Sequence, residues 1–196
     1  MRLNARVVRA NIAALLLALS LPSPVAAQSG DTLPTAGDIS TATVRIDNFG
    51  QVNQGYYRGA QPEGRDYAEL SALGIKTVIN LTSDDAQTNE RSMVERAEMM
   101  YFEIPMTTHE PPTAAQLAQF LEIVNDPANQ PVYVHCVGGR HRTGVMTAVY
   151  RMTADSWTPD QAFKEMKQYK FGADFLHPEF KQFIYGYRAE PALAAA

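Results

Sequence analysis

The stretch of chain that decides the fold is PVYVHCVGGRHRTGVMTAVY, at residues 131–150. Its first four residues are β-branched or aromatic apart from Pro131, and they predict a buried strand. Its last seven, from Gly144 to Tyr150, are mostly apolar and predict the first turns of a buried helix. Between the two runs lies a short loop that contains the single cysteine of the chain, Cys136. The stretch therefore predicts a strand, a tight loop and a helix in direct succession.

The Cys136 loop, residues 136–141, has the composition of an anion-binding site with a nucleophile in it. Backbone N–H groups converge at the start of a helix, where the helix dipole is positive. The same positive field favours the thiolate, which is the nucleophilic form of a cysteine. Arg142 can donate two parallel N–H groups to a phosphoryl group. The alternative is a buried structural cysteine beside a solvated turn, since a lone cysteine is commonly buried.

The spacing of a cysteine, five residues, an arginine and a threonine resembles that of the cysteine-dependent protein tyrosine and dual-specificity phosphatases. Further segments resemble the plant-and-fungi-type atypical dual-specificity phosphatases and their bacterial relatives. These segments are Tyr57–Pro62, Gly74–Leu81, Glu110–Thr113 and Gly139–Gly144. The resemblance runs from about Tyr56 to Tyr169. It implies a metal-independent phosphatase without a cofactor, acting on phosphotyrosine or phosphoserine/threonine proteins or on inositol-phosphate-type small molecules.

The expected roles follow from this chemistry. Cys136 attacks phosphorus and forms a phosphocysteine intermediate, while Arg142 stabilises the phosphoryl oxygens. Thr143 assists the departure of the thiolate in the second step; alternatively, it is only a helix N-cap. The predicted phosphate-binding residues are Val137, Gly138, Gly139, Arg140, His141 and Arg142.

The general acid is less clearly indicated. Phosphatases of this superfamily usually supply it as an aspartate on a separate loop, and the corresponding loop here, residues 106–112, has no aspartate. By comparison with members that have Asp-His before a Pro-Pro pair, the aspartate position falls on Thr108. Glu110 is then the nearest carboxylic acid, and His109 is the second choice. The alternative is that Glu110 only flanks the start of a helix.

Two further side chains are expected near the site. His135, one residue before the nucleophile, is expected to be a structural histidine that fixes the loop through hydrogen bonds. Arg58 either reaches the site or pairs with acidic residues nearby, and we favour a structural role for it.

The ends of the chain divide it into a predicted signal peptide (1–27), a flexible leader (28–43), a phosphatase domain (44–189) and a disordered tail (190–196). The first segment has three arginines, an apolar run and a small-residue site at 25–27. Its apolar run is short for a membrane span of about 20 residues. Removing three of 17 basic residues and no acidic ones leaves 14 − 21 = −7. The expected protein is periplasmic or secreted, with no stable membrane anchor after cleavage and no nucleic-acid partner.

The remaining pattern predicts an α/β fold: a central, mainly parallel sheet flanked by helices, with the cysteine loop between a strand and a helix. The resemblance implies that this fold is dual-specificity-phosphatase-like. Strands are expected at 44–46, 56–58, 75–81, 101–104 and 131–134, with a turn region at 50–55. Helices are expected at 65–73, 88–99, 113–125, from 144, from 158 and at 178–188.

Three classes of function remain open at this point. The first is an exported cysteine-dependent phosphatase. The second is a phosphate-binding pseudophosphatase that lacks an efficient general acid. The third is another enzyme with a cysteine at an anion site, such as a sulfurtransferase or an arsenate reductase. The presence of Cys136, Arg142 and Thr143 together favours the first class over the second, and the Arg-Thr-Gly entry into the helix favours a phosphatase over a sulfurtransferase.

Overall fold

The computed structural model of the chain describes residues 44–83 and 86–189. The predicted signal peptide, leader and tail lie outside the described residues. The helices and strands, in chain order, are β1 (Gly50–Asn53), β2 (Tyr56–Gly59), α1 (Asp66–Ala72), β3 (Thr77–Asn80), α2 (Glu90–Arg96), β4 (Met100–Glu103), α3 (Ala114–Asn125), β5 (Val132–His135), α4 (Arg142–Ala154), α5 (Pro159–Gln168), the short 3-10 helix η2 (Asp174–Leu176) and α6 (Pro178–Gly186).

The five strands form one sheet in the order β1-β2-β5-β3-β4. β1 pairs antiparallel with β2, and the other neighbours pair in parallel. The prediction of a mainly parallel α/β sheet is confirmed. β5 is the central strand and has parallel neighbours on both sides, so all four of its residues are buried.

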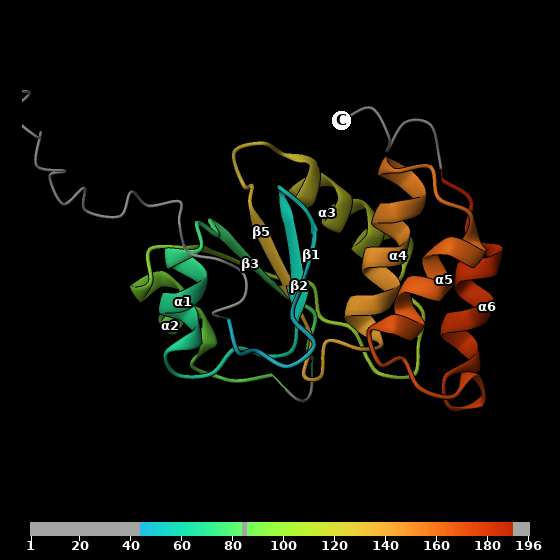
Figure 1. Cartoon of the computed structure of the whole chain (residues 1–196), viewed down its shortest axis with the longest axis horizontal. Helices are drawn as coiled ribbons and strands as arrows, with labels where there is room; N and C mark the ends of the chain where they lie inside the picture. The colour runs from blue at the N-terminus through green and yellow to red at the C-terminus, as the bar shows by residue number, and fades with distance from the viewer. Residues whose placement is uncertain (1–43, 84–85, 190–196) are drawn as a thin grey trace, which may run out of the picture. The chain divides into compact units, whose positions relative to one another are not determined.

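Helices cover both faces of the sheet, with α1 and α2 on one face and α3 to α6 on the other (Figure 1). Side chains alternate along β5 accordingly. Val132 and Val134 pack in the core cluster of α3 and α4, whereas Tyr133 packs in the cluster of α1 and α2. Each fully buried side chain of this kind contributes about 1.5–3 kcal/mol relative to an exposed one. Packing on both faces therefore fixes the position and direction of β5, and with them the position of Cys136, the residue that follows it.

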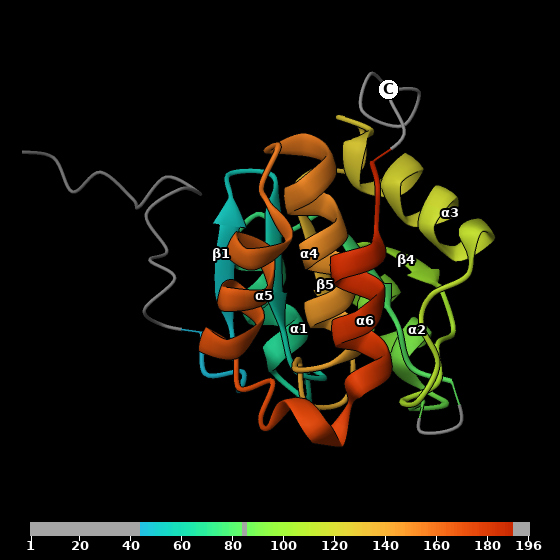
Figure 2. The same ribbon diagram turned by 90° about the vertical axis from the view of Figure 1, so that its right-hand side faces the viewer.

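The α4 helix is buried almost all round. Figure 2 shows α5 and α6 in front of α4, and a third core cluster joins the three helices through Val145, Ala148, Phe163 and Phe180. A helix that starts directly after the Cys136 loop is thus held between the sheet and a second layer of helices. This packing keeps the amino end of α4 in place.

The sequence prediction was wrong at the amino-terminal edge of the sheet. Residues 44–46, expected as a strand, are not in one, and β1 lies instead at Gly50–Asn53, in the expected turn region. An edge strand needs only one buried side chain, here Val52, and its other positions can be polar. Ile46 is buried because it packs in the core cluster between the sheet and the helices α1 and α2, although it does not belong to a strand.

Local helix signals predicted the helix starts more accurately. Thr113 and Thr158 both form capping boxes, with Gln116 and Gln161 respectively, at the predicted starts of α3 and α5. The α2 helix ends at Arg96 rather than near residue 99, since Glu98 adopts a left-handed conformation at φ 60°.

Within the described ranges, no helix combines the length and apolar character that a membrane crossing requires.

Candidate active site

The Cys136 loop joins the central strand β5 to the buried helix α4, at the carboxyl-terminal ends of the parallel strands (Figure 1). Cys136 is only 3% exposed. It lines a cavity of about 430 Å³. The other residues of the lining come from the Cys136 loop, from Arg142 and, at one position, from the 106–112 loop. The lining residues are Thr108, Cys136, Val137, Gly138, Arg140, His141 and Arg142.

The carbonyl groups of the loop are held from the β2 side. The amide of Gln61 donates to the Val137 carbonyl at 3.1 Å. The Gly139 carbonyl accepts from the Asn48 side chain at 2.8 Å and from the Arg58 guanidinium at 2.7 Å. These donors lie between 76 and 91 positions away in the chain, so the conformation of the loop is imposed by the tertiary structure.

The amides of the loop are available for an anion. Within the described part of the chain, the N–H groups of residues 137–141 donate to no backbone carbonyl. They precede the first turn of α4, where the helix dipole is positive. A run of amides of this kind at a helix start binds phosphate and similar anions.

Gly139 makes this loop conformation possible. Its φ is +62°, in the left-handed region that side chains other than glycine rarely adopt. A Cβ at this position would lie 2.4 Å from the carbonyl carbon of Gly59, closer than carbon atoms approach. The loop therefore packs directly on the backbone of β2, and glycine is required there on two grounds.

Arg142 and Thr143 are the first two residues of α4 and are both buried. Arg142 is 2% exposed, and its Nη1 donates to the Met106 carbonyl at 3.1 Å, at the start of the 106–112 loop. The alternative that Thr143 is an N-cap is wrong, because His141 occupies the cap position. Within the described residues, the Thr143 hydroxyl has no hydrogen-bond partner.

The structure separates the three candidate positions of the 106–112 loop. Thr108 lines the cavity with Cys136. Glu110 is exposed, and its Oε2 accepts from the Thr107 hydroxyl at 3.4 Å. His109 is also exposed, with its ring 5.9 Å from that of His177. The residue at the expected aspartate position thus faces the cavity, whereas neither predicted acid is among the residues that line it.

His135 is fully buried and is held from the opposite side of the sheet. Its Nε2 lies 2.9 Å from Oε1 of Glu90, the first residue of α2. The expectation of a structural histidine agrees with this burial, but the charged partner is on α2 and not in the loop.

Sequence reasoning missed Glu90, because an acidic residue in the first turn of a helix is common and does not by itself indicate a buried partner. It is fully buried, and its carboxylate accepts hydrogen bonds from Gln61 and Asn80, each at 2.7 Å, and from Tyr101 at 3.1 Å. Burial alone would raise the pKa of Glu90, but the contacts with His135, Gln61 and Tyr101 outweigh it and hold the pKa below its usual value.

Arg58 has a structural position beneath the loop. It is fully buried, and its guanidinium carbon lies 4.0 Å from the ring centroid of Tyr169. Its guanidinium donates to the Gly139 carbonyl, and within the described residues no ion pair joins it to an acidic side chain, so the alternative of pairing with acidic residues is not observed. Burial lowers the pKa of Arg58, while the nearby Tyr56 and Tyr169 phenols and Cys136 act in the opposite direction.

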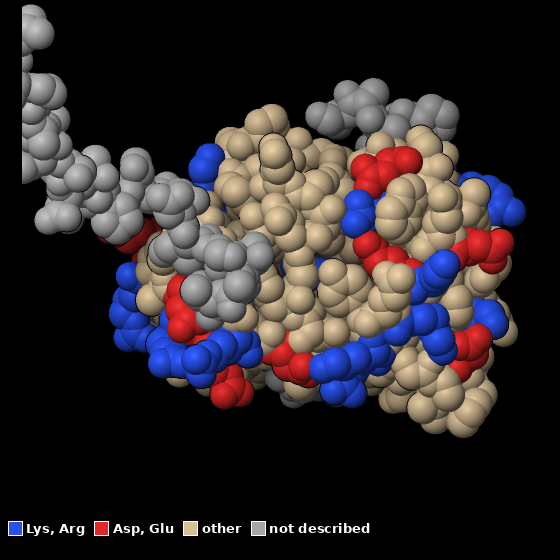
Figure 3. Space-filling model, viewed as in Figure 1, with Lys and Arg blue, Asp and Glu red and all other residues tan. Residues whose placement is uncertain are grey.

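The positive charge around the cavity is modest. Arg140 lies 3.7 Å from Asp47, which also pairs with Lys170. The His141 Nε2 donates to the Phe171 carbonyl at 2.9 Å, and burial lowers the pKa of His141. Figure 3 shows Lys and Arg side chains along the same edge of the molecule, with Asp and Glu among them. Much of this charge is thus compensated.

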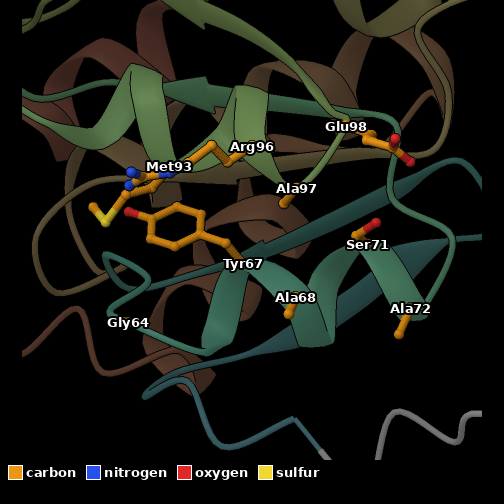
Figure 4. A pocket seen from close by; sticks show the side chains of 9 residues that line it. All are labelled: Gly64, Tyr67, Ala68, Ser71, Ala72, Met93, Arg96, Ala97 and Glu98. Carbon is orange, nitrogen blue, oxygen red and sulfur yellow. The ribbon is translucent and has the colours of Figure 1, made fainter.

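A larger hollow of about 650 Å³ lies between α1 and α2, remote in sequence from the Cys136 loop. Figure 4 shows Tyr67, Met93 and Arg96 around it, together with small side chains of α1. It contains no nucleophile next to an anion-binding loop. The Cys136 cavity is therefore the candidate active site.

Comparison with known proteins agrees with this geometry. A family model described as "DSP-PTPase phosphatase fused to NAD+ Kinase" matches residues 41–181. The chain is 29% identical over 126 residues to the probable tyrosine-protein phosphatase DG1060 of Dictyostelium discoideum, covering 62% of this chain and 75% of that protein.

Two further relatives have solved structures. The dual specificity protein phosphatase TpbA of Pseudomonas aeruginosa is 28% identical, over 64% of this chain and 56% of its own length. The inositol diphosphatase SIW14 of Saccharomyces cerevisiae is 25% identical, over 68% of this chain and 49% of its own. The SIW14 core in complex with citrate superimposes with a TM-score of 0.66 at 25% identity, covering 76% and 90% of the two chains. A TpbA variant in complex with pTyr gives 0.62 at 25% identity, covering 75% and 88%. The chain thus spans only about half the length of these two relatives.

Proposed function

The chain belongs to the DSP-PTPase phosphatase family and is a cysteine-type phosphatase, and from this premise we propose that it hydrolyses phosphotyrosine and phosphoserine/threonine esters through a phosphocysteine intermediate. The observation that carries the proposal is the Cys136 cavity. The nucleophile, the arginine and a run of available amides line one space, while the Val137 and Gly139 carbonyls are bound by donors on the β2 side.

In the first step, Cys136 attacks phosphorus in line as a thiolate. An S–P bond forms while the P–O bond to the leaving group breaks, and the leaving oxygen takes the electron pair and a proton. The amides of residues 137–141 and the guanidinium of Arg142 stabilise the charge on the three remaining oxygens. Because these donors are already fixed by packing, they need no reorganisation during the reaction.

In the second step, a water molecule attacks the phosphocysteine. An O–P bond forms, the S–P bond breaks, and the thiolate leaves as inorganic phosphate is released. The proposed role of the Thr143 hydroxyl is to donate to the departing sulfur. The support is its position in the first turn of α4 and its lack of a hydrogen-bond partner within the described residues. Glu110 on the 106–112 loop is the proposed proton donor of the first step and acceptor of the second, and reaches the cavity when that loop moves over the substrate.

The rim of the cavity favours an aromatic phosphate ester over a highly charged ligand. Val137 lines the cavity and is 47% exposed, which offers an apolar surface next to the phosphate site. Besides Arg142, the cavity is lined by the cation Arg140, and the carboxylate of Asp47 nearby offsets part of its charge. A ligand with many phosphates needs several uncompensated cations, whereas a phosphotyrosine ring needs one phosphate site and an apolar contact.

The test is phosphate release by the full chain without added metal, from a phosphotyrosine peptide, a phosphoserine peptide and a set of inositol polyphosphates and pyrophosphates. Cys136→Ser removes the nucleophile and should abolish release from every substrate. Thr143→Val should slow only the second step, so that a burst of leaving group precedes slow turnover. Release by Cys136→Ser equal to that of the unchanged chain would refute the mechanism, and a preference for inositol pyrophosphates would move the substrate to the small-molecule class.

We also propose that the protein is exported. The support is the first 27 residues, with their basic start, apolar run and small-residue site. Amino-terminal sequencing of the protein from fractionated cells tests this. Recovery of the chain from the cytoplasmic fraction with residue 1 or 2 at its amino terminus would contradict export.

A further inference from the structure

Three of the four histidines of the chain lie together beside the Cys136 cavity. The rings of His141 and His177 have centroids 3.8 Å apart, and those of His109 and His177 are 5.9 Å apart. These residues come from three separate parts of the chain: the 106–112 loop, the Cys136 loop and the start of α6. The mechanism proposed above does not use His177, and packing alone does not require a histidine at the exposed position 109.

The donor atoms of His109, His177 and Glu179 converge. One ligand atom from each lies within 4.8 Å of the other two. Within this set, His177 Nδ1 lies 3.3 Å from Glu179 Oε1. Two ligands on one zinc ion are about 3.3 Å apart, given metal–ligand distances of about 2.0–2.2 Å and tetrahedral angles. The pair at the start of α6 already has this spacing, and a rotation of the exposed His109 side chain completes the set.

We propose that His109, His177 and Glu179 form a binding site for a divalent transition metal, with Zn²⁺ as the preferred ion. Two imidazoles and one carboxylate are a donor set that zinc accepts, with a fourth position left for water. Magnesium and calcium prefer all-oxygen sites, so this set selects against them.

The α6 side of the site is packed against the core. The His177 ring contacts the ring of His141 at a centroid distance of 3.8 Å and stacks on that of Phe180 at 5.8 Å. Phe180 is fully buried in the core shared by α4, α5 and α6. The carboxylate of Glu179 in the first turn of α6 offsets the positive end of the helix dipole, which by itself opposes a cation there.

The bound metal would fasten the 106–112 loop to α6. His109 directly follows Thr108, which lines the Cys136 cavity, and His141 lines the same cavity. An ion on His109 therefore restrains the loop that carries the proposed acid, and slows turnover. This consequence rests on the proposed function, whereas metal binding does not.

Calorimetric titration of the full chain with Zn²⁺, after removal of metal by a chelator, tests the site directly. One equivalent should bind, and His109→Ala and Glu179→Gln should each weaken binding about 100-fold or more, since even residues behind the ligands contribute 10–100-fold. Glu122→Gln, an exposed acid on α3, is the matched control and should bind as the unchanged chain does. Co²⁺ in place of Zn²⁺ should give the visible absorption of a tetrahedral site.

Cys136→Ser separates this site from metal binding by the catalytic thiolate. Retention of the one equivalent in Cys136→Ser supports the proposal, and its loss there overturns it. Unchanged binding in His109→Ala and Glu179→Gln overturns it equally. The effect on turnover is measured separately with Glu179→Gln: saturating Zn²⁺ should slow the unchanged chain and not this variant. A chain that binds zinc as described but releases no phosphate would refute the proposed function and leave the metal site standing.

Discussion

Gly139→Ala is the substitution whose effect the structure defines best. The new Cβ would lie 2.4 Å from the carbonyl carbon and oxygen of Gly59 and 2.7 Å from the amide nitrogen of Ala60. All three atoms belong to the backbone of β2 and its continuation, so no side chain can rotate away. Because carbon atoms in contact are about 3.5–4.0 Å apart, the loop must move by about 1 Å.

Two costs add up at this position. Placing alanine at a φ of +62° costs about 1–2 kcal/mol, and forcing extra volume against a packed surface costs about 1–3 kcal/mol. The free energy of unfolding should therefore fall by about 2–5 kcal/mol. For a domain of this size the melting temperature should fall by about 6–15 °C. A displacement of about 1 Å of the loop amides should also lower kcat/KM by about 100-fold.

Two other glycines separate these contributions. Gly172 has a φ of +88°, and a Cβ added there would meet no atom within 4 Å, so Gly172→Ala should cost about 1–2 kcal/mol and leave kcat/KM unchanged. Gly138 is outside the left-handed region, and its Cβ would lie 3.4 Å from the Arg140 side chain, so Gly138→Ala should leave the melting temperature nearly unchanged.

Thermal unfolding followed by circular dichroism and steady-state phosphatase assays on the three variants provide the comparison. Gly139→Ala should be the least stable and the least active of the three variants. If Gly139→Ala were as stable and as active as Gly172→Ala, the close packing of the loop on β2 would be refuted for the protein in solution.

Three further predictions concern the charged groups of the site. Arg142→Lys should lower kcat/KM about 10²–10³-fold, because one ammonium group cannot donate two parallel N–H groups; a change below about threefold in the peptide assay would contradict this. Glu90→Gln should cost about 1–3 kcal/mol near neutral pH. Since the pKa of Glu90 is held below its usual value, its ionised form contributes stability above about pH 4.3 that is lost as the pH falls further. The difference in melting temperature between the two proteins should therefore shrink below that pH, and a constant difference would exclude the charge as its cause. Glu110→Gln should remove the basic limb of the pH–rate profile and slow phosphotyrosine hydrolysis about 10²-fold, with little effect on esters of strongly acidic alcohols; Glu122→Gln is the control, and an unchanged basic limb removes Glu110 as the acid.

The chain itself determined the parts of this protein whose interactions are local. Strand, loop and helix around Cys136 are contiguous, so β-branched residues, glycines and the apolar run after them suffice to predict the unit and its chemistry. The capping boxes at Thr113 and Thr158 act within three residues, and both helix starts were predicted correctly. The mainly parallel sheet followed from the alternation of these local units.

Only the tertiary structure decided which distant residues support the site. Asn48 and Arg58 reach the Gly139 carbonyl across 91 and 81 positions, and Glu90 meets His135 through the packing of α2 on the sheet. No local pattern marks Asn48 or Glu90, and none indicates the partner of Arg58, because these partners are chosen by the strand order β1-β2-β5-β3-β4, which brings remote segments side by side. The same strand order also made the polar segment at Gly50–Asn53 an edge strand. Its backbone pairs with β2, whereas its side chains have no pattern that predicts a strand.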